Sequence, residues 1–194
     1  MTGEPSPARQ RRILGLTFGL NVLLAAGLAV GGWTADSSSL LANAVDNASD
    51  SVVYALSLFA VGAGARWKRA AATVSGALLI VFAIGVLGDT ARRYIFGSEP
   101  IGATMMTLAI VAAIINLVCL RLMQSLKTSD PNIKAARTFS FNDFIGNGGI
   151  LLAGAAVAWT GQQWPDLVVG AAVAAISLKG GVAILRDASD HGGQ

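Results

Sequence analysis

Charged residues are scarce in this sequence. Asp, Glu, Lys and Arg make up 13% of its 194 residues, against roughly 25% in soluble domains. Apolar residues make up 54%, and the mean hydropathy is +0.61. A water-soluble protein needs charged groups to cover its surface, and a disordered chain has few apolar residues, so both classes are excluded. The composition is that of an integral membrane protein.

Cysteine and histidine are equally scarce. The single cysteine excludes a disulfide framework and a multi-cysteine zinc site. The single histidine, His191 in the polar tail, excludes a metal site built from clustered histidines. The net charge of +3 does not indicate a nucleic-acid partner, because the basic residues are scattered between apolar runs.

Six apolar stretches are long enough to cross a bilayer, which takes about 20 residues. They cover residues 13–33, 38–62, 70–87, 102–122, 139–160 and 167–185. We therefore expect an all-α integral membrane protein, a bundle of six transmembrane helices over residues 13–187. A polar head over 1–12 and a short tail over 188–194 flank it, and no soluble C-terminal domain is expected.

The basic residues alternate between the connections. The head and the second and fourth connections are basic, the first and fifth contain no Lys or Arg, and the third has only Arg92 and Arg93. By the positive-inside rule, both termini are expected in the cytoplasm. Four tryptophans near segment ends are expected to anchor the helices at the membrane interfaces: Trp33, Trp67, Trp159 and Trp164.

Three acidic residues fall inside the apolar stretches: Asp46 and Asp50 in the second, and Asp143 in the fifth. A charge at the centre of a membrane helix costs roughly 2.5–3.5 kcal/mol, so such residues usually have a function. Asp46 and Asp50 are four residues apart and share one helix face, with Asn43 one turn earlier. Asp143 and Asn147 have the same spacing. The pattern predicts two facing rows of oxygen ligands for a divalent cation or for protons.

The plainer interpretations are structural. The aspartates could be protonated packing residues, and Asn43 and Asn147 could simply hold helices together through their amide groups. Asn21, Asn116 and Cys119 are interpreted as packing residues. Three glycines are predicted to allow close approach between helices: Gly146, Gly148 and Gly149.

Two stretches resemble a known family. Residues 39–51, Ser-Leu-Leu-Ala-Asn-Ala-Val-Asp-Asn-Ala-Ser-Asp-Ser, resemble the second helix of the cation diffusion facilitator family of metal transporters. Residues 142–154, Asn-Asp-Phe-Ile-Gly-Asn-Gly-Gly-Ile-Leu-Leu-Ala-Gly, resemble its fifth helix. An aromatic-rich turn and an aspartate then open the sixth stretch, as in the family, here as Trp164-Pro165-Asp166.

The resemblance implies a metal-ligand set. Asp46, Asp50 and Asp143 match three of the family's ligands. The fourth falls on Phe139, which cannot bind a metal, so Asn147, Asn43 or a water molecule is expected to complete the shell. Two further oxygens would reach the site only from an irregular helix: those of Ser140 and Asn142.

Two departures from the family pattern stand out. The second cytoplasmic connection is a tight basic turn, whereas the family usually has a longer loop there. The family's cytoplasmic ferredoxin-like domain has no counterpart in the nine residues after residue 185. Any homodimer is therefore expected to form through the membrane spans.

The resemblance implies proton-coupled efflux of divalent transition-metal cations, zinc or cadmium first, across a bacterial inner membrane. Neither a resident cofactor nor an enzymatic reaction is expected. Because the ligands are all oxygen atoms, manganese, iron(II) or magnesium is the alternative cargo. Phe139 and the missing domain also fit a non-transporting sensor or scaffold on a degenerate transporter fold. A membrane phosphotransferase fits worse, since no further Asp or Arg follows Asp50 before Arg66.

Overall fold

Six α-helices form the protein, and a computed structural model describes residues 6–59, 65–126 and 131–190. The helices are α1 (Pro7–Thr34), α2 (Ser38–Phe59), α3 (Ala65–Phe96), α4 (Gly102–Gln124), α5 (Pro131–Thr160) and α6 (Trp164–Asp190). No strand occurs in these ranges. The fold is the six-helix all-α bundle that the sequence predicts.

Proline and glycine mark the helix ends. Pro7 begins α1 and Pro131 begins α5, at positions where the missing N–H breaks no helical hydrogen bond. Gly97 follows α3 with φ +86°, and Gly161 follows α5 with φ +65°. Glycine adopts this left-handed conformation without strain, so the chain can leave each helix sharply.

Several helices extend past the predicted apolar stretches. α3 begins at Ala65 instead of residue 70, so the basic segment 65–69, expected as a connection, is helical. Arg92 and Arg93, expected in the third loop, lie in the last turns of α3. Hydropathy marks the length of the hydrocarbon layer, whereas helical hydrogen bonding continues into the headgroup region. The segments 60–64 and 127–130 lie outside the described residues.

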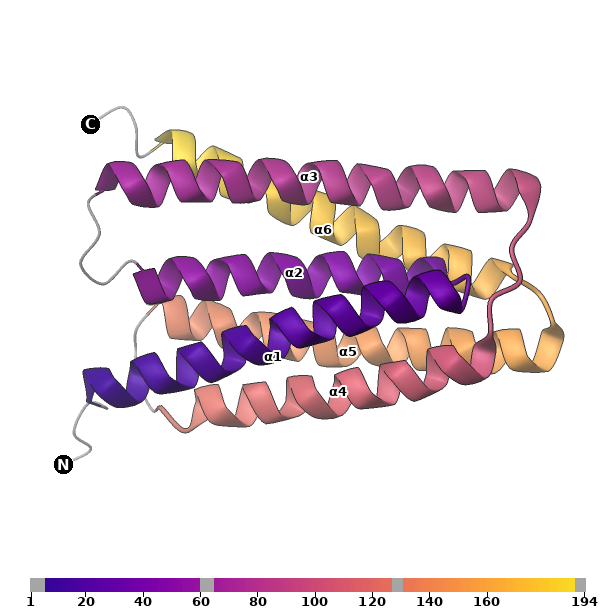
Figure 1. The fold of residues 1–194 in the computed structure, drawn as a ribbon, viewed down its shortest axis with the longest axis horizontal. Coiled ribbons are helices and arrows are strands. Elements are labelled where there is room, and N and C mark those ends of the chain that lie inside the picture. Colours follow the sequence, from indigo (N-terminus) through magenta and orange to yellow (C-terminus); the bar gives the residue numbers. More distant parts are fainter. Residues whose placement is uncertain (1–5, 60–64, 127–130, 191–194) are drawn as a thin grey trace.

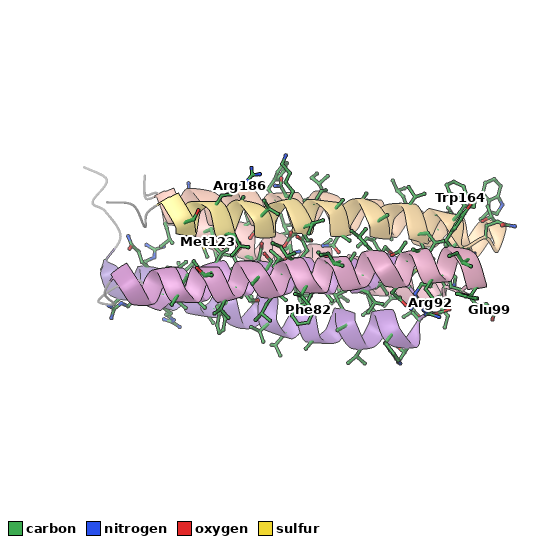
Figure 2. The ribbon with its side chains drawn as sticks, turned by 90° about the horizontal axis from the view of Figure 1, so that it is seen from above. Phe82, Arg92, Glu99, Met123, Trp164 and Arg186 are labelled. Atoms are coloured by element: carbon green, nitrogen blue, oxygen red, sulfur yellow. The ribbon has the colours of Figure 1, made fainter. Side chains whose placement is uncertain are left out.

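The helices run lengthwise, and α1 begins at the same end of the bundle at which α6 ends (Figure 1). We call this the terminal end. The connections 35–37, 97–101 and 161–163 lie at the opposite, turn end. In Figure 2, Arg92, Glu99 and Trp164 lie toward the turn end and Arg186 toward the terminal end. The cytoplasmic location of the terminal end stays a prediction.

The central helix is α2, which contacts all five other helices. α3 packs against α6, while α4 packs against α5 and α1 against α2. Four helices are long and apolar enough to cross a membrane: α1, α3, α4 and α6. α2 and α5 carry more polar residues, and several of these are buried against neighbouring helices, such as Asn47, Asp143 and Asn147. The chain is a multi-pass membrane protein.

Small residues allow the closest helix contacts. A Cβ atom added to Gly102 in α4 would lie 2.5 Å from the carbonyl oxygen of Gly154 in α5, so a side chain at residue 102 would separate the two helices. The prediction that Gly146, Gly148 and Gly149 allow close approach between helices is wrong. A Cβ atom added to any of these glycines would have no described atom of another helix within 4 Å. Spacing alone does not reveal which glycines face another helix.

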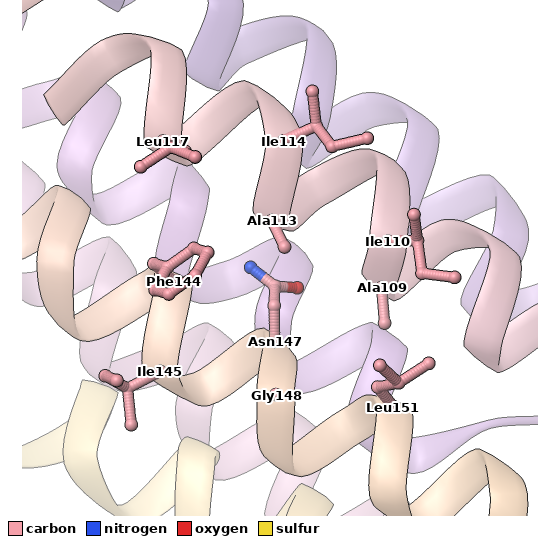
Figure 3. Close-up of a pocket in the computed structure, with 10 residues that line it drawn as sticks. All are labelled: Ala109, Ile110, Ala113, Ile114, Leu117, Phe144, Ile145, Asn147, Gly148 and Leu151. Atoms are coloured by element: carbon pink, nitrogen blue, oxygen red, sulfur yellow. The ribbon is translucent and has the colours of Figure 1, made fainter. Parts of the chain in front are cut away.

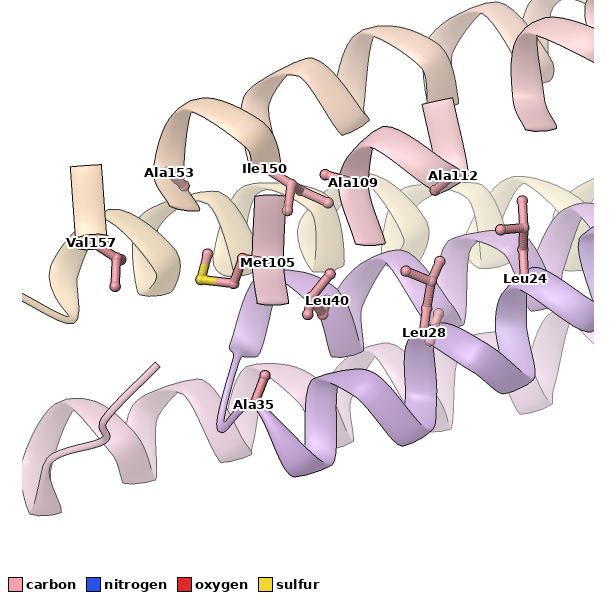
Figure 4. Close-up of a cluster of buried hydrophobic side chains, with 11 residues drawn as sticks. Leu24, Leu28, Ala35, Leu40, Met105, Ala109, Ala112, Ile150, Ala153 and Val157 are labelled. Atoms are coloured by element: carbon pink, nitrogen blue, oxygen red, sulfur yellow. The ribbon is translucent and has the colours of Figure 1, made fainter. Parts of the chain in front are cut away.

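Two apolar clusters fill the group formed by α1, α2, α4 and α5. The turn-side cluster lies near the turn end (Figure 4), and its larger members are Leu24, Leu28, Leu40, Met105, Ile150 and Val157. The terminal-side cluster consists of Ile13, Leu14, Tyr54, Met123 and Leu126. Between the two clusters, each of these helices carries polar residues that point inward, and the predicted site lies there.

Candidate metal centre

The three predicted aspartates lie in the middle of the bundle on α2 and α5. Asp50 is 6% exposed and Asp143 is 4% exposed, while Asp46 is half-buried. The carboxyl groups of Asp46, Asp50 and Asp143 lie close enough to one another to interact electrostatically. The structure thus brings together the acidic residues that the sequence selected.

Two carboxylate oxygens of this group are left without partners. Oδ2 of Asp50 and Oδ2 of Asp143 are buried and find no hydrogen-bond partner among the described residues. No Lys or Arg forms an ion pair with either residue in that part of the chain. A buried, unpartnered carboxylate oxygen is costly unless a proton or a cation meets it.

The three carboxylates do not form a closed ligand cluster. Within the described ranges, no group of three His, Cys, Asp or Glu side chains is arranged to hold a metal ion. Asp46 accepts a hydrogen bond of 3.0 Å from the hydroxyl of Ser177 in α6, which turns one of its oxygens toward that helix. Binding one ion through all three residues therefore requires their side chains to rotate toward it.

The candidate auxiliary ligands pair with each other. Nδ2 of Asn43 donates to Oδ1 of Asn147 over 2.8 Å, which joins α2 to α5. Nδ2 of Asn147 donates to the backbone carbonyl of Asp143, and Nδ2 of Asn47 donates to Oδ1 of Asn43. Both candidate oxygens already accept a hydrogen bond, although an amide oxygen has a second lone pair. Their part in metal binding stays a prediction.

Residue 139 lies within α5, four residues before Asp143, but the side chain of Phe139 is outside the described part of the structure. The next residue, Ser140, is 1% exposed, and its hydroxyl lies 3.2 Å from that of Tyr54. Asn142 is exposed on the unbroken helix α5, so its amide does not face the aspartates. The irregular helix that Asn142 would need as a ligand is absent from this stretch.

Two grooves next to the site are apolar. A groove of about 330 Å³ between α4 and α5 reaches the side chain of Asn147 (Figure 3), which is its one polar lining residue among those described. A second groove, of about 600 Å³, lies between α1, α2 and α3, and Asp89 is the one charged residue of its described lining. Neither lining suits a hydrated cation, so both fit lipid-facing surfaces.

Sequence reasoning missed the role of Asp166. This residue of α6 is 0% exposed and accepts hydrogen bonds from the first residues of α2. The backbone N–H groups of Ser38 and Ser39 donate over 2.6 and 3.0 Å, and the hydroxyls of Ser37 and Ser39 over 2.7 and 2.6 Å. A carboxylate at a helix N-terminus satisfies free N–H groups and complements the helix dipole. The three consecutive serines at residues 37–39, where the second stretch begins, were the available signal.

An ion-pair group at the turn end was also missed. Arg93 is 3% exposed and pairs with Asp36 in the α1–α2 connection and with Asp89 in its own helix. Asp36 has a left-handed φ of 51° and also accepts a hydrogen bond of 2.9 Å from the N–H of Glu99. Because hydropathy placed Arg93 in a loop, its burial against two acids could not be anticipated.

Comparison with known proteins gives one family match over most of the chain. The family described as the cation efflux transmembrane domain matches residues 14–191. Zinc transporter ZitB of Yersinia pestis is 24% identical over 193 residues, covering 93% of this chain and 62% of that protein. The cadmium, cobalt and zinc/H(+)-K(+) antiporter of Bacillus subtilis is 27% identical over 175 residues, covering 82% and 56%.

A third relative is covered by the alignment to a similar extent. The metal cation efflux system protein CzcD of Cupriavidus metallidurans is 25% identical over 175 residues, covering 84% of this chain and 55% of the relative. The chain thus spans between 55% and 62% of the length of these three relatives. The similarity concerns the membrane helices described above.

Proposed function

This chain belongs to the cation efflux family, and from that membership we propose that it exports divalent transition-metal cations in exchange for protons. The family is the one that residues 39–51 and 142–154 predicted, and it is a family of membrane transporters. We assign no catalytic reaction and no resident cofactor to the chain. The membrane is proposed to be the cell (inner) membrane of a bacterium.

One observation carries this proposal. Asp46, Asp50 and Asp143 lie together on α2 and α5 inside a membrane bundle, and two of their buried oxygens have no partner among the described residues. Oxygens in this state are complementary to a cation or to protons, and both bind the same lone pairs. A site that binds either one, but not both, is what exchange of a metal for protons requires.

Zinc or cadmium is the proposed cargo. The relatives are named for zinc, cadmium and cobalt, which supports that choice. The three carboxylates and the nearby amides are hard oxygen ligands, however, and on ligand softness alone they favour manganese, iron(II) or magnesium. A manganese or iron(II) exporter is therefore the second candidate.

The proposed mechanism is alternating access around the aspartates. From the cytoplasmic side, a cation displaces protons from Asp46, Asp50 and Asp143 and is held by the ionised carboxylates. After the bundle opens to the other side, protons rebind and release the cation. No histidine lies in the described ranges, so the carboxylates must carry the protons themselves.

A non-transporting sensor or scaffold is the alternative from another class. The absence of a closed cluster of His, Cys, Asp or Glu among the described residues favours it, as does Phe139 in place of a fourth ligand.

A homodimer held through membrane spans stays part of the proposal, since exposed apolar residues such as Leu23 and Leu152 offer lipid-facing surface for it.

Reconstitution in vesicles tests the proposal. The purified chain is placed in proteoliposomes, and uptake of zinc, cadmium, manganese, iron(II) and magnesium is measured with and without an imposed pH gradient. Uptake of one or more cations that increases with the gradient is expected, and it identifies the cargo. Equal uptake in protein-free vesicles would leave the scaffold as the better account.

A further inference from the structure

Ser177 in α6 contacts the aspartate site from a helix that supplies none of the predicted ligands. This serine is 2% exposed, and its hydroxyl donates a hydrogen bond to Oδ1 of Asp46 over 3.0 Å. Asp46 is half-buried, whereas Asp50 and Asp143 are buried and each keep one oxygen without a partner among the described residues. The most exposed of the three carboxylates is therefore the one that α6 holds.

The Ser177 hydroxyl has a second acceptor within reach. The backbone carbonyl of Val173, four residues earlier in α6, lies 3.2 Å from the serine oxygen. A hydroxyl carries a single proton, so it serves either the Asp46 carboxylate or the Val173 carbonyl at any moment. Rotation about the Cβ–Oγ bond moves the proton from one acceptor to the other without moving the serine oxygen. If Asp46 turns away, no buried donor on α6 is left unsatisfied.

The packing of α6 against α2 keeps Ser177 level with Asp46. A Cβ atom added to Gly170 would lie 2.8 Å from the carbonyl carbon of Ser38, so the two backbones are in close contact there. Both helices begin at the turn end and run parallel from this contact. Ser177 comes seven residues after Gly170, and Asp46 comes eight residues after Ser38. At an equal rise per residue, the serine and the aspartate therefore reach nearly the same depth.

Binding of one cation by all three carboxylates competes with the hydrogen bond from Ser177. The aspartates do not form a closed ligand cluster within the described ranges, and Oδ1 of Asp46 faces α6. For Asp46 to join Asp50 and Asp143 around an ion, its carboxylate must turn away from the serine. The hydrogen bond therefore stabilises the metal-free arrangement and not the metal-bound one.

We propose that Ser177 is a positioning residue of the metal site, whose hydroxyl holds the Asp46 carboxylate toward α6 without metal and releases it when a divalent cation binds. Ser177 is not a ligand in this scheme, because it acts only through Asp46. The Val173 carbonyl accepts the serine proton while the cation is bound.

The consequence for transport rests on the proposed export function. An exporter must release its cation as well as bind it, so a site that holds the ion too tightly turns over slowly. The hydrogen bond that Asp46 regains from Ser177 favours release. Ser177 therefore lowers the affinity of the site, and its removal should tighten binding. The loss of a group that only supported the fold would not have this effect.

The Ser177→Ala variant tests this role, because it removes the competing donor and leaves all three carboxylates in place. Binding of zinc and of manganese to the detergent-purified full chain is measured by calorimetry at one pH. The affinity for the ion that binds is expected to rise about tenfold, which is the effect of losing one hydrogen bond to a charged group in the metal-free state. In proteoliposomes, KM and kcat are expected to fall together, because a more tightly held cation leaves more slowly.

Two further variants separate the hydroxyl from side-chain packing. Ser177→Thr keeps a hydroxyl at this position and is expected to bind metal like the wild type. Ser51→Ala is the matched control. Ser51 is also buried, and its hydroxyl also donates to the carbonyl four residues earlier, that of Asn47, over 2.8 Å, but to no aspartate in the described part of the chain. Its replacement is expected to leave metal affinity and uptake unchanged.

The outcomes separate the role of Ser177 from the export function. Tighter binding in Ser177→Ala alone supports the role. An affinity that is unchanged or weaker in Ser177→Ala overturns it and leaves export standing if the wild type transports. A rise of the same size in Ser51→Ala or Ser177→Thr also overturns it, and if the threonine variant does not fold, the two alanine variants decide. A wild type that binds no divalent cation overturns both proposals.

Discussion

The side chains of Asp46, Asp50 and Asp143 differ in the hydrogen bonds that they accept. Asp46 accepts a hydrogen bond from Ser177, whereas Asp50 and Asp143 each keep one buried oxygen without a partner in the described part of the chain. The two unpartnered carboxylates contribute least to the stability of the metal-free fold. Their presence inside a membrane bundle is therefore better explained by what they bind.

Replacing any of the three aspartates tests this assignment. Asp46→Ala, Asp50→Ala and Asp143→Ala are each expected to abolish metal transport, because each removes one carboxylate of the proposed site. Membrane insertion and the free energy of unfolding should change little for Asp50 and Asp143, since their replacement removes an unsatisfied buried group. Uptake into proteoliposomes and thermal unfolding measure both effects.

The control for these variants is Glu99→Gln, which changes an exposed acidic residue at the turn end. It is expected to leave uptake unchanged. Near-normal transport by any one of the three alanine variants would remove that residue from the site.

Phe139 occupies the position that the family resemblance gives to the fourth ligand. Residues 139 and 143 are four apart in α5 and so share a helix face. Phe139→His is expected to place an imidazole beside Asp143 and to shift the preference from manganese toward zinc. Competition between the two cations in vesicle uptake measures the shift. An unchanged preference would show that this position does not face the site.

At the scale of elements, α6 is attached to α2 at two places. Asp166 caps the first turn of α2 near the turn end, and Ser177 contacts Asp46 halfway along. Gly170 lies between them, and a Cβ atom added to it would be 2.8 Å from the carbonyl carbon of Ser38, so the backbones are close there. The position of the aspartate helix is therefore set partly by α6, a helix that supplies no predicted ligand.

Removing the Asp166 carboxylate should weaken this junction. Asp166→Ala leaves two backbone N–H groups and two serine hydroxyls of the α2 start without their acceptor. The free energy of unfolding is expected to fall by about 2–4 kcal/mol, since these are buried hydrogen bonds to a charged group. Denaturant unfolding in detergent measures the loss. The exposed Gln162→Ala is the control, and equal stability of the two variants would mean that the cap contributes little.

Across the whole molecule, the binding of metal and of protons should be linked. Three carboxylates close together in a membrane bundle repel one another when ionised, so at least one is expected to hold a proton near neutral pH in the absence of metal. A divalent cation must then release one or two protons on binding, and acid must weaken its affinity.

Calorimetry on the detergent-solubilised protein between pH 5 and 8 tests this linkage. Metal affinity is expected to fall as the pH falls, and the protons released should appear as a dependence of the binding heat on the buffer. No histidine lies in the described ranges, so the change belongs to the carboxylates. An affinity that is constant over this range would contradict proton exchange and favour a uniporter or a scaffold.

Much of this architecture could be predicted from the sequence. The length of the apolar stretches predicts six helices. A hydrocarbon layer of about 30 Å takes about 20 residues of helix at a rise of 1.5 Å per residue, and each stretch is about that long. The spacing of Asp46 and Asp50 places them on one face of a helix in any fold. The motifs in residues 39–51 and 142–154 were sufficient to identify the family that the comparison confirms.

Only the tertiary structure decided which residues meet. The burial of Arg93 between Asp36 and Asp89, and the cap that Asp166 forms on α2, join residues far apart in the chain. The same holds for Asn21 and Asn116, whose buried side-chain oxygens have no hydrogen-bond partner among the described residues because of how α1 and α4 pack. Helix periodicity fixes the face on which a side chain lies, but the neighbour on that face depends on how the six helices pack, and no single stretch of sequence encodes that packing.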